Sequence, residues 1–112
     1  MALVVITKRL EEEINKKFKG ESVEIFSLMH SLEENPKKGK EIGNINKVLI
    51  KEIRYNKYRF YFLTDGYKIK FFKIEDLKEL IIKFVRMSEK KDQEKVINEI
   101  KYVLKNMGEE GF

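Results

Sequence analysis

Apolar residues in the first third of the chain follow helical spacing, after one short extended run. Leu3 to Ile6 is apolar and of strand length. Thr7 is a favourable N-cap for the helix that follows, and Gly20 suits the position just past its end. The apolar residues of this helix recur every four positions, at Leu10, Ile14 and Phe18.

A second helix is predicted from about Ser22. It must end before Asn35-Pro36, because a residue that precedes proline disfavours the helical region. Its apolar stripe comprises Ile25, Leu28, Met29 and Leu32. Two helices joined at a glycine predict an antiparallel helix hairpin.

Residues 48–73 are instead rich in β-branched and aromatic side chains, which favour strands. Val48 to Arg54 and Tyr58 to Leu63 are predicted strands. Asp65-Gly66 is a strong hairpin signal, so Lys68 to Lys73 is expected to return as the next strand. Leu80 to Met87 fits a strand or a buried helix, and its length and branched residues favour strand.

The last periodic segment predicts a helix capped by Ser88 and closed by Gly108. Its apolar face comprises Val96, Ile97, Ile100, Val103, Leu104 and Met107. No repeat or flexible linker divides the 112 residues. The sequence therefore predicts one α+β domain over residues 1–112, with an N-terminal helix hairpin on an antiparallel sheet meander and a C-terminal helix.

The predicted Asp65-Gly66 turn fixes which side chains share a sheet face, because it sets Leu63 opposite Lys68. Alternation then gives a core face and an exposed face. The core face holds Phe60, Phe62, Ile69 and Phe71, and the exposed face holds Arg59, Tyr61, Lys68 and Lys70. Cations beside an aromatic ring fit RNA, since the cations meet phosphates and the ring stacks on a base. A solvated lysine face explains this hairpin equally well.

Positive charge is concentrated in the middle of the chain. Residues 37–73 hold eleven Lys/Arg against three Asp/Glu, net +8, whereas residues 1–36 are net −2 and residues 74–112 are net −1. Such clustering predicts a nucleic acid or an acidic protein as the partner.

Composition and the first residues exclude several other classes of protein. There is no cysteine and the only histidine is His30, so one chain cannot build a His/Cys zinc site, and no metal or cofactor is predicted. The apolar opening is too short for a signal peptide or a membrane span. We therefore expect a cytoplasmic protein with no membrane association.

Four short motifs occur in an order typical of one toxin family. They are Asn35-Pro36-Lys37-Lys38-Gly39, Glu52-Ile53-Arg54, Tyr58-Arg59-Phe60-Tyr61-Phe62 and the run from Phe84 to Gln93. Through them the chain resembles, over most of residues 7–105, the RelE/HigB-type ribonuclease toxins of prokaryotic toxin–antitoxin pairs.

The resemblance implies a fold and an activity. The fold has two N-terminal helices, a sheet meander and a C-terminal segment or helix. The activity is metal-independent cleavage of mRNA, typically on the ribosome, with the ribose 2′-hydroxyl as internal nucleophile. The implied partners are mRNA, the ribosome and an antitoxin protein, and the expected assemblies are a homodimer or a hetero-oligomer with that antitoxin.

The resemblance also implies roles for particular residues. Arg54 and Arg59 match phosphate-stabilising positions, and Tyr61 matches a residue that stacks on a base or orients the site. Lys90 and Lys91 match a basic pair with acid/base roles. The further RNA-binding candidates are Lys37, Lys38, Lys51, Lys68, Lys70 and Arg86.

Two departures from the family pattern keep other functions open. Where some members carry a lysine, the register from Arg59 places Glu52, and Lys51 then points to the opposite face. The segment Lys73 to Glu79 resembles an insertion. The alternatives are a non-catalytic nucleic-acid-binding domain and a protein-interaction module, both using the same basic face.

Overall fold

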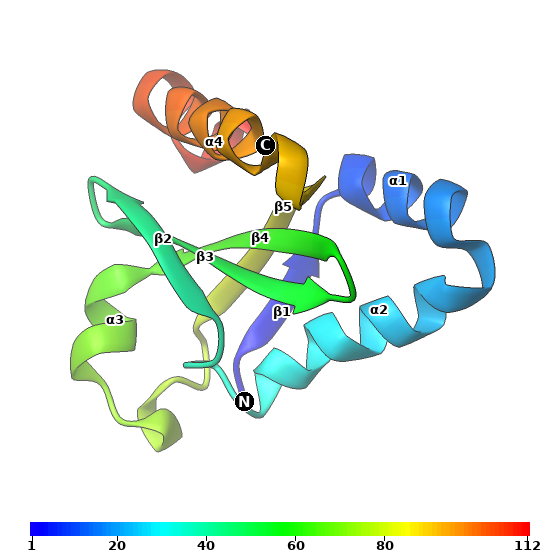
Figure 1. Cartoon of the computed structure of the whole chain (residues 1–112). Helices are drawn as coiled ribbons and strands as arrows, with labels where there is room; N and C mark the ends of the chain where they lie inside the picture. Colours follow the sequence, from blue (N-terminus) through cyan, green and yellow to red (C-terminus); the bar gives the residue numbers. More distant parts are fainter.

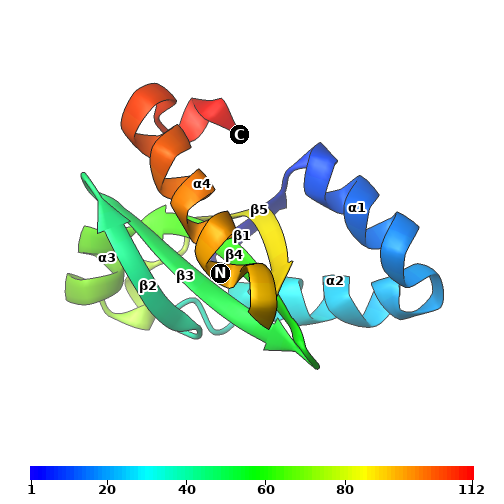
Figure 2. The same cartoon turned by 45° about the horizontal axis from the view of Figure 1, so that its top comes forward.

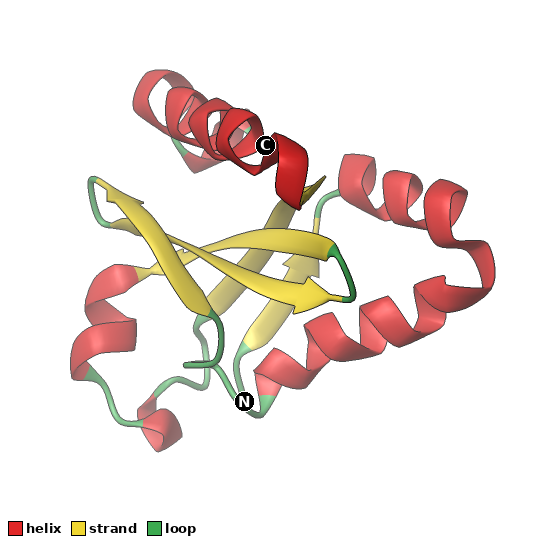
Figure 3. Cartoon of the chain, in the orientation of Figure 1, coloured by secondary structure: helices red, strands yellow, loops and turns green.

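The computed structural model describes residues 1–112 as an α+β structure built on one five-stranded sheet (Figures 1 and 3). Four short 3₁₀ turns link the longer elements, among them Ile74–Asp76 and Lys90–Asp92, and a fifth, Glu109–Gly111, follows the last helix. The strands and helices, in chain order, are β1 Leu3–Ile6, α1 Lys8–Phe18, α2 Ser22–His30, β2 Lys40–Ile45, β3 Val48–Tyr55, β4 Tyr58–Asp65, α3 Gly66–Phe71, β5 Ile81–Glu89 and α4 Gln93–Met107.

The sheet has the strand order β1-β5-β4-β3-β2. Strands β3 and β4 pair antiparallel, as predicted, and β5 pairs antiparallel with β4. Strand β2, which the sequence does not predict, pairs antiparallel with β3, whereas β1 runs parallel to β5 from Leu3 opposite Ile81 to Ile6 opposite Phe84. The sheet is therefore mixed, and the prediction of a purely antiparallel meander is wrong at this edge. No tight turn follows β1, so nothing local forces an antiparallel pairing there.

The first helix begins as predicted and ends differently. The Leu10 N–H donates to Thr7 Oγ1 at 3.3 Å, which confirms Thr7 as the N-cap. At the other end, Lys19 adopts the positive φ of 45°, and Gly20 lies in a 3₁₀ turn that leads directly into α2. The predicted role of Gly20 is wrong, because the chain reverses one residue earlier.

Helices cover both faces of the sheet (Figure 2). On one face, α1 and α2 pack Leu10, Ile14, Ile25 and Met29 against Phe60, Phe62 and Phe84. On the other face, α4 packs Ile100 and Leu104 against Ile50, Tyr61, Leu63 and Val85. The exposed sheet face predicted for Arg59 and Tyr61 is therefore wrong, since α4 crosses it.

The predicted hairpin at Asp65-Gly66 does not form. Asp65 Oδ1 accepts the Lys68 N–H at 3.0 Å and so caps α3, which occupies the region predicted as a return strand. The edge of β4 where that strand was expected is taken by β5. Asp-Gly is compatible with a hairpin turn and with a helix start, and the pairing with β5 selects the second.

The last helix begins later than predicted. Ser88 is still in β5, and Glu89 and Asp92 form a capping box that leads into α4. Gly108 ends α4 with φ 67°, as predicted. None of the four helices combines the length and the apolar character needed to cross a bilayer.

Candidate nucleic-acid interface

Two neighbouring rows of polar side chains run across the sheet, on the face that α4 packs against. One row is Lys40, Glu52, Tyr61 and Arg86, and the next is Arg54, Arg59 and Ser88, taken across β2 to β5. Directly paired residues point to the same side of a sheet, so these seven side chains share one face. We call them the polar rows.

Glu52 lies at the centre of the polar rows. Its side chain is 1% exposed, and its Oε2 lies 3.4 Å from Arg59 Nε and 3.5 Å from Arg54 Nε. Neither carboxylate oxygen accepts a hydrogen bond. A buried carboxylate is costly unless cations compensate it, so Glu52 fixes the positions of the two guanidinium groups around it.

The two arginines differ in their access to a ligand. The Arg59 side chain is 7% exposed, whereas that of Arg54 is 58% exposed. Arg54 also lines a cavity of about 250 Å³ beside Glu52, together with Lys38 and Lys40. Three cations around one cavity form a favourable site for a phosphate group.

Tyr61 and Arg86 are held by the protein itself. Tyr61 is fully buried and its hydroxyl shares a 2.8 Å hydrogen bond with Ser88 Oγ. Burial raises the pKa of Tyr61, and the bond to Ser88 opposes the shift. Arg86 Nε donates to Glu99 Oε1 at 2.7 Å. Neither side chain is free, so Tyr61 cannot stack on an RNA base and Arg86 is not an RNA-binding cation.

Lys51 lies on the opposite face of β3, as the register from Arg59 indicated. It is 2% exposed, and its Nζ donates to the Lys37 carbonyl at 2.8 Å. Burial lowers the pKa of Lys51, and the nearby Glu41 partly opposes this. Lys51 therefore anchors the loop before β2 instead of contacting a ligand, while the side chain of Lys37 stays exposed.

The remaining predicted cations fall into two groups. Lys90 and Lys91 are exposed in the 3₁₀ turn directly after β5, close to the row that ends at Ser88. Lys68 and Lys70 lie on α3, which follows the end of β4, whereas Arg59 is near its beginning. Lys68 and Lys70 are therefore remote from the polar rows.

Two contributors to this interface were missed from the sequence. Glu52 was placed on the correct face but was read only as a departure from a family pattern. The sequence alone gives Lys40 no role. A β2–β3 hairpin predicted over residues 40–55 would have placed Lys40 opposite Glu52, on the face of Arg54. Nowhere do three or more His, Asp or Glu side chains gather in an arrangement that could hold a metal ion.

Comparisons with protein-family models, with curated proteins and with solved structures gave no match to this chain.

Proposed function

We propose that the chain is a RelE/HigB-like toxin, a metal-independent endoribonuclease that cleaves mRNA in the cytoplasm, on the ribosome, and is neutralised by an antitoxin that covers the exposed cations Lys38, Lys40 and Arg54. One observation carries the proposal. The motifs on which the resemblance rests contribute Lys38, the neighbouring Arg54 and Arg59, and Ser88, which come from three separate parts of the sequence and lie at one end of the sheet. Two helices before the antiparallel strands and a helix at the end of the chain also support the proposal, although β1 precedes those helices and α3 interrupts the strands.

The chemistry follows from the accessible cations. A phosphate of the RNA binds in the cavity between Lys38, Lys40 and Arg54. The ribose 2′-oxygen attacks the phosphorus and the bond to the 5′-oxygen breaks. A base takes the 2′-hydroxyl proton and an acid protonates the leaving oxygen. Arg54 stabilises the charge that develops on the phosphate, and Lys90 and Lys91 are the exposed acid/base candidates.

A second candidate function, RNA binding without cleavage, is favoured by the burial of Glu52. Its carboxylate is the only one in the polar rows, and a side chain that is 1% exposed cannot reach a 2′-hydroxyl. In that case the same cavity binds phosphate, and strongly salt-dependent affinity with intact RNA is the expected behaviour.

Induced expression in a bacterial host tests the first function. Wild type is compared with Arg54→Ala, and Lys47→Ala in the turn between β2 and β3 removes the same charge from an exposed site outside the cavity. We expect wild type and Lys47→Ala to arrest growth and to produce discrete mRNA ends, and Arg54→Ala to lose both.

Normal growth and intact mRNA with soluble wild-type protein would contradict the ribonuclease proposal. If Arg54→Ala is as toxic as wild type, the proposal that Arg54 binds the reacting phosphate is contradicted. RNA binding by purified wild type, with a salt slope that falls by about one on Arg54→Ala substitution, would then support the second candidate.

A further inference from the structure

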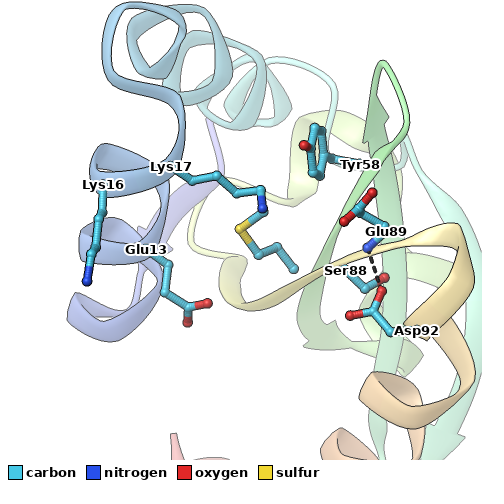
Figure 4. A pocket seen from close by; sticks show the side chains of 8 residues that line it. Glu13, Lys16, Lys17, Tyr58, Ser88, Glu89 and Asp92 are labelled. Atoms are coloured by element: carbon cyan, nitrogen blue, oxygen red, sulfur yellow. Dashed lines mark hydrogen bonds between the residues drawn. The ribbon is translucent and has the colours of Figure 1, made fainter.

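A second cavity, of about 410 Å³, opens between α1, the start of β4 and the end of β5 (Figure 4). It lies where the sheet loses a strand, because β1 pairs with β5 only as far as Phe84 and leaves the edge of the following residues uncovered. Its volume is within the range of small-molecule sites, about 300–1,000 Å³. Of the seven side chains in the polar rows, only Ser88 lines this cavity.

The apolar surface of the cavity suits a flat ring. Tyr58 and Met87 are its two hydrophobic lining residues. Phe18 contacts the Tyr58 ring edge-on, with centroids 4.8 Å apart, and so fixes its orientation. Lys17 reaches across from α1, with its Nζ 5.4 Å from the centre of the Tyr58 ring. A fixed aromatic ring with a cation beside it favours a nucleobase with its phosphate.

The polar surface of the cavity carries three carboxylates, those of Glu13, Glu89 and Asp92, beside the amines of Lys16 and Lys17. Glu13 Oε1 also lies 3.5 Å from Arg9 Nε, and Glu89 Oε1 lies 3.6 Å from Lys57 Nζ. Glu13 points from α1 toward Asp92 on the opposite side, and Glu89 lies above them (Figure 4). Asp92 Oδ1 accepts the Glu89 N–H at 2.8 Å, which holds this side in place, and each carboxylate retains further lone pairs. Carboxylates only accept, so the edge of the ligand that meets them must donate.

The cavity adjoins the polar rows through Ser88. This residue lines the cavity, pairs with Arg59 in the sheet and shares a hydrogen bond with Tyr61. Tyr58 is the neighbour of Arg59 on β4, and successive strand residues are about 3.3 Å apart. Arg54 lines the first cavity and Tyr58 the second, and both residues lie at the turn end of the β3–β4 hairpin, so one RNA strand can reach both cavities.

We propose that this cavity binds an amino-bearing nucleobase of the RNA, namely adenine, guanine or cytosine, and discriminates against uracil. The three bases present an exocyclic amine to the carboxylates, whereas the only donor on the pairing edge of uracil is N3–H, which lies between two carbonyl oxygens that the carboxylates repel. The proposal rests on the proposed function in that the ligand is RNA, and it assigns the selection of the base to Glu13 and the stacking of the base to Tyr58.

Binding of mononucleotides tests the proposal without any need for cleavage. The ¹⁵N-labelled full chain is titrated with 5′-AMP, 5′-GMP, 5′-CMP and 5′-UMP, and amide shifts are followed by NMR. We expect shifts in α1 and in residues 87–92, with UMP binding at least about tenfold more weakly than the other three.

Substitutions then assign the selection to the side chains. Glu13→Gln is expected to weaken binding of AMP, GMP and CMP about tenfold, because a charged acceptor is lost, and to narrow the difference from UMP. Glu12→Gln, on the same helix and outside the cavity, is the control and should change nothing. Tyr58→Leu is expected to weaken all four nucleotides, with Tyr102→Leu on the exposed side of α4 as its control.

Equal binding of the four nucleotides, shifts located elsewhere, or no shift at millimolar concentration would overturn the proposal. Loss of folding in Tyr58→Leu does not affect the Glu13 test, because the Glu13 side chain is 45% exposed. If the NMR titrations show selection among the nucleotides but expressed wild type neither arrests growth nor cuts mRNA, the base-binding site is supported and the nuclease proposal is contradicted. If wild type and Glu13→Gln cut mRNA at the same positions, the nuclease proposal is supported and the base-binding site is contradicted.

Discussion

Replacing Arg59 with methionine isolates the role of the buried Glu52 carboxylate. Methionine keeps an unbranched side chain of similar reach and removes the guanidinium group. Glu52, 1% exposed, then has only Arg54 at 3.5 Å, and the Arg54 side chain is 58% exposed. Removal of one partner from a buried ion pair costs about 3–5 kcal/mol, because the remaining charge is left uncompensated.

That loss is a large part of the stability of a domain of this size, for which the free energy of unfolding is about 5–15 kcal/mol. The midpoint of thermal unfolding is expected to fall by about 10–20 °C. Arg54→Met, by contrast, breaks a solvent-exposed contact and is expected to cost less than about 1 kcal/mol.

The double variant Glu52→Gln/Arg59→Met supplies the decisive comparison. Without the carboxylate there is no buried charge to compensate, so the double variant is expected to be more stable than Arg59→Met by at least about 2 kcal/mol. Urea unfolding followed by far-UV circular dichroism gives the free energies of unfolding of wild type, Glu52→Gln, Arg59→Met and the double variant, which are the four members of the cycle. If Arg59→Met stays within about 1 kcal/mol of wild type, or if the second substitution recovers nothing, Glu52 does not hold the arginines as we describe.

Three further predictions test other parts of the structure. Gly39 has φ 110°, and a Cβ there would lie 2.9 Å from Phe62 Cζ and 3.1 Å from the Glu52 carbonyl, so Gly39→Ala is expected to destabilise by about 1–3 kcal/mol. Gly20→Ala, which meets nothing within 4 Å, is the control; urea unfolding of both variants should separate them. Thr7→Ala is expected to cost about 1 kcal/mol in the same assay, because it removes the acceptor for the Leu10 N–H, and Thr7→Ser should restore it. Hydrogen bonding to Glu24, together with burial and a hydrogen bond to Glu21, raises the pKa of Tyr55, and burial raises that of Tyr61. A phenol whose folded-state pKa is raised contributes stability that is present below its ordinary pKa of 10 and is lost as the pH rises through the higher folded value. In a titration of wild type followed by tyrosinate absorbance, the phenols of Tyr55 and Tyr61 should ionise at higher pH than the others. Tyr55→Phe and Tyr61→Phe should each remove one of these high-pH ionisations, and a variant that keeps both would contradict the raised pKa of the residue replaced.

Local periodicity was sufficient to predict how the side chains of β4 are distributed. The alternation that separated Arg59 and Tyr61 from Phe60 and Phe62 is present in the structure, and so is the position of Glu52 on the face of Arg59. These relations depend on the two-residue repeat of a strand and on the tight turn between β3 and β4 at residues 56–57, both of which are local.

Long-range pairing decided what the sequence could not show. Asp65-Gly66 has two compatible local structures, and the position of β5 beside β4 selects the helix. Whether the face of Arg59 met solvent depended on where α4 packed, and α4 buries Tyr61 and pairs with Arg86 through Glu99. No periodicity within β4 carries that information.

Charge counted along the chain is a poor guide to charge in space. Of the eleven cations in residues 37–73, Lys51 is buried against the Lys37 carbonyl, and Lys68 and Lys70 lie on α3, remote from Arg54. The cluster that does form takes Lys38, Lys40 and Arg54 from different elements.

The pairing of β1 with β5 has a consequence for the order in which the protein folds. Leu3 has its partner only when Ile81 is present, and the row through Arg54 and Arg59 is completed only by Ser88. Contacts between residues so far apart in sequence close long loops and form late. A nascent chain that has released only α1, α2 and β2 to β4 therefore has the cations Lys38, Lys40 and Arg54, but it has neither a closed sheet nor Lys90 and Lys91. Any cleavage of RNA therefore arises only after β5 and the turn that follows it have been synthesised.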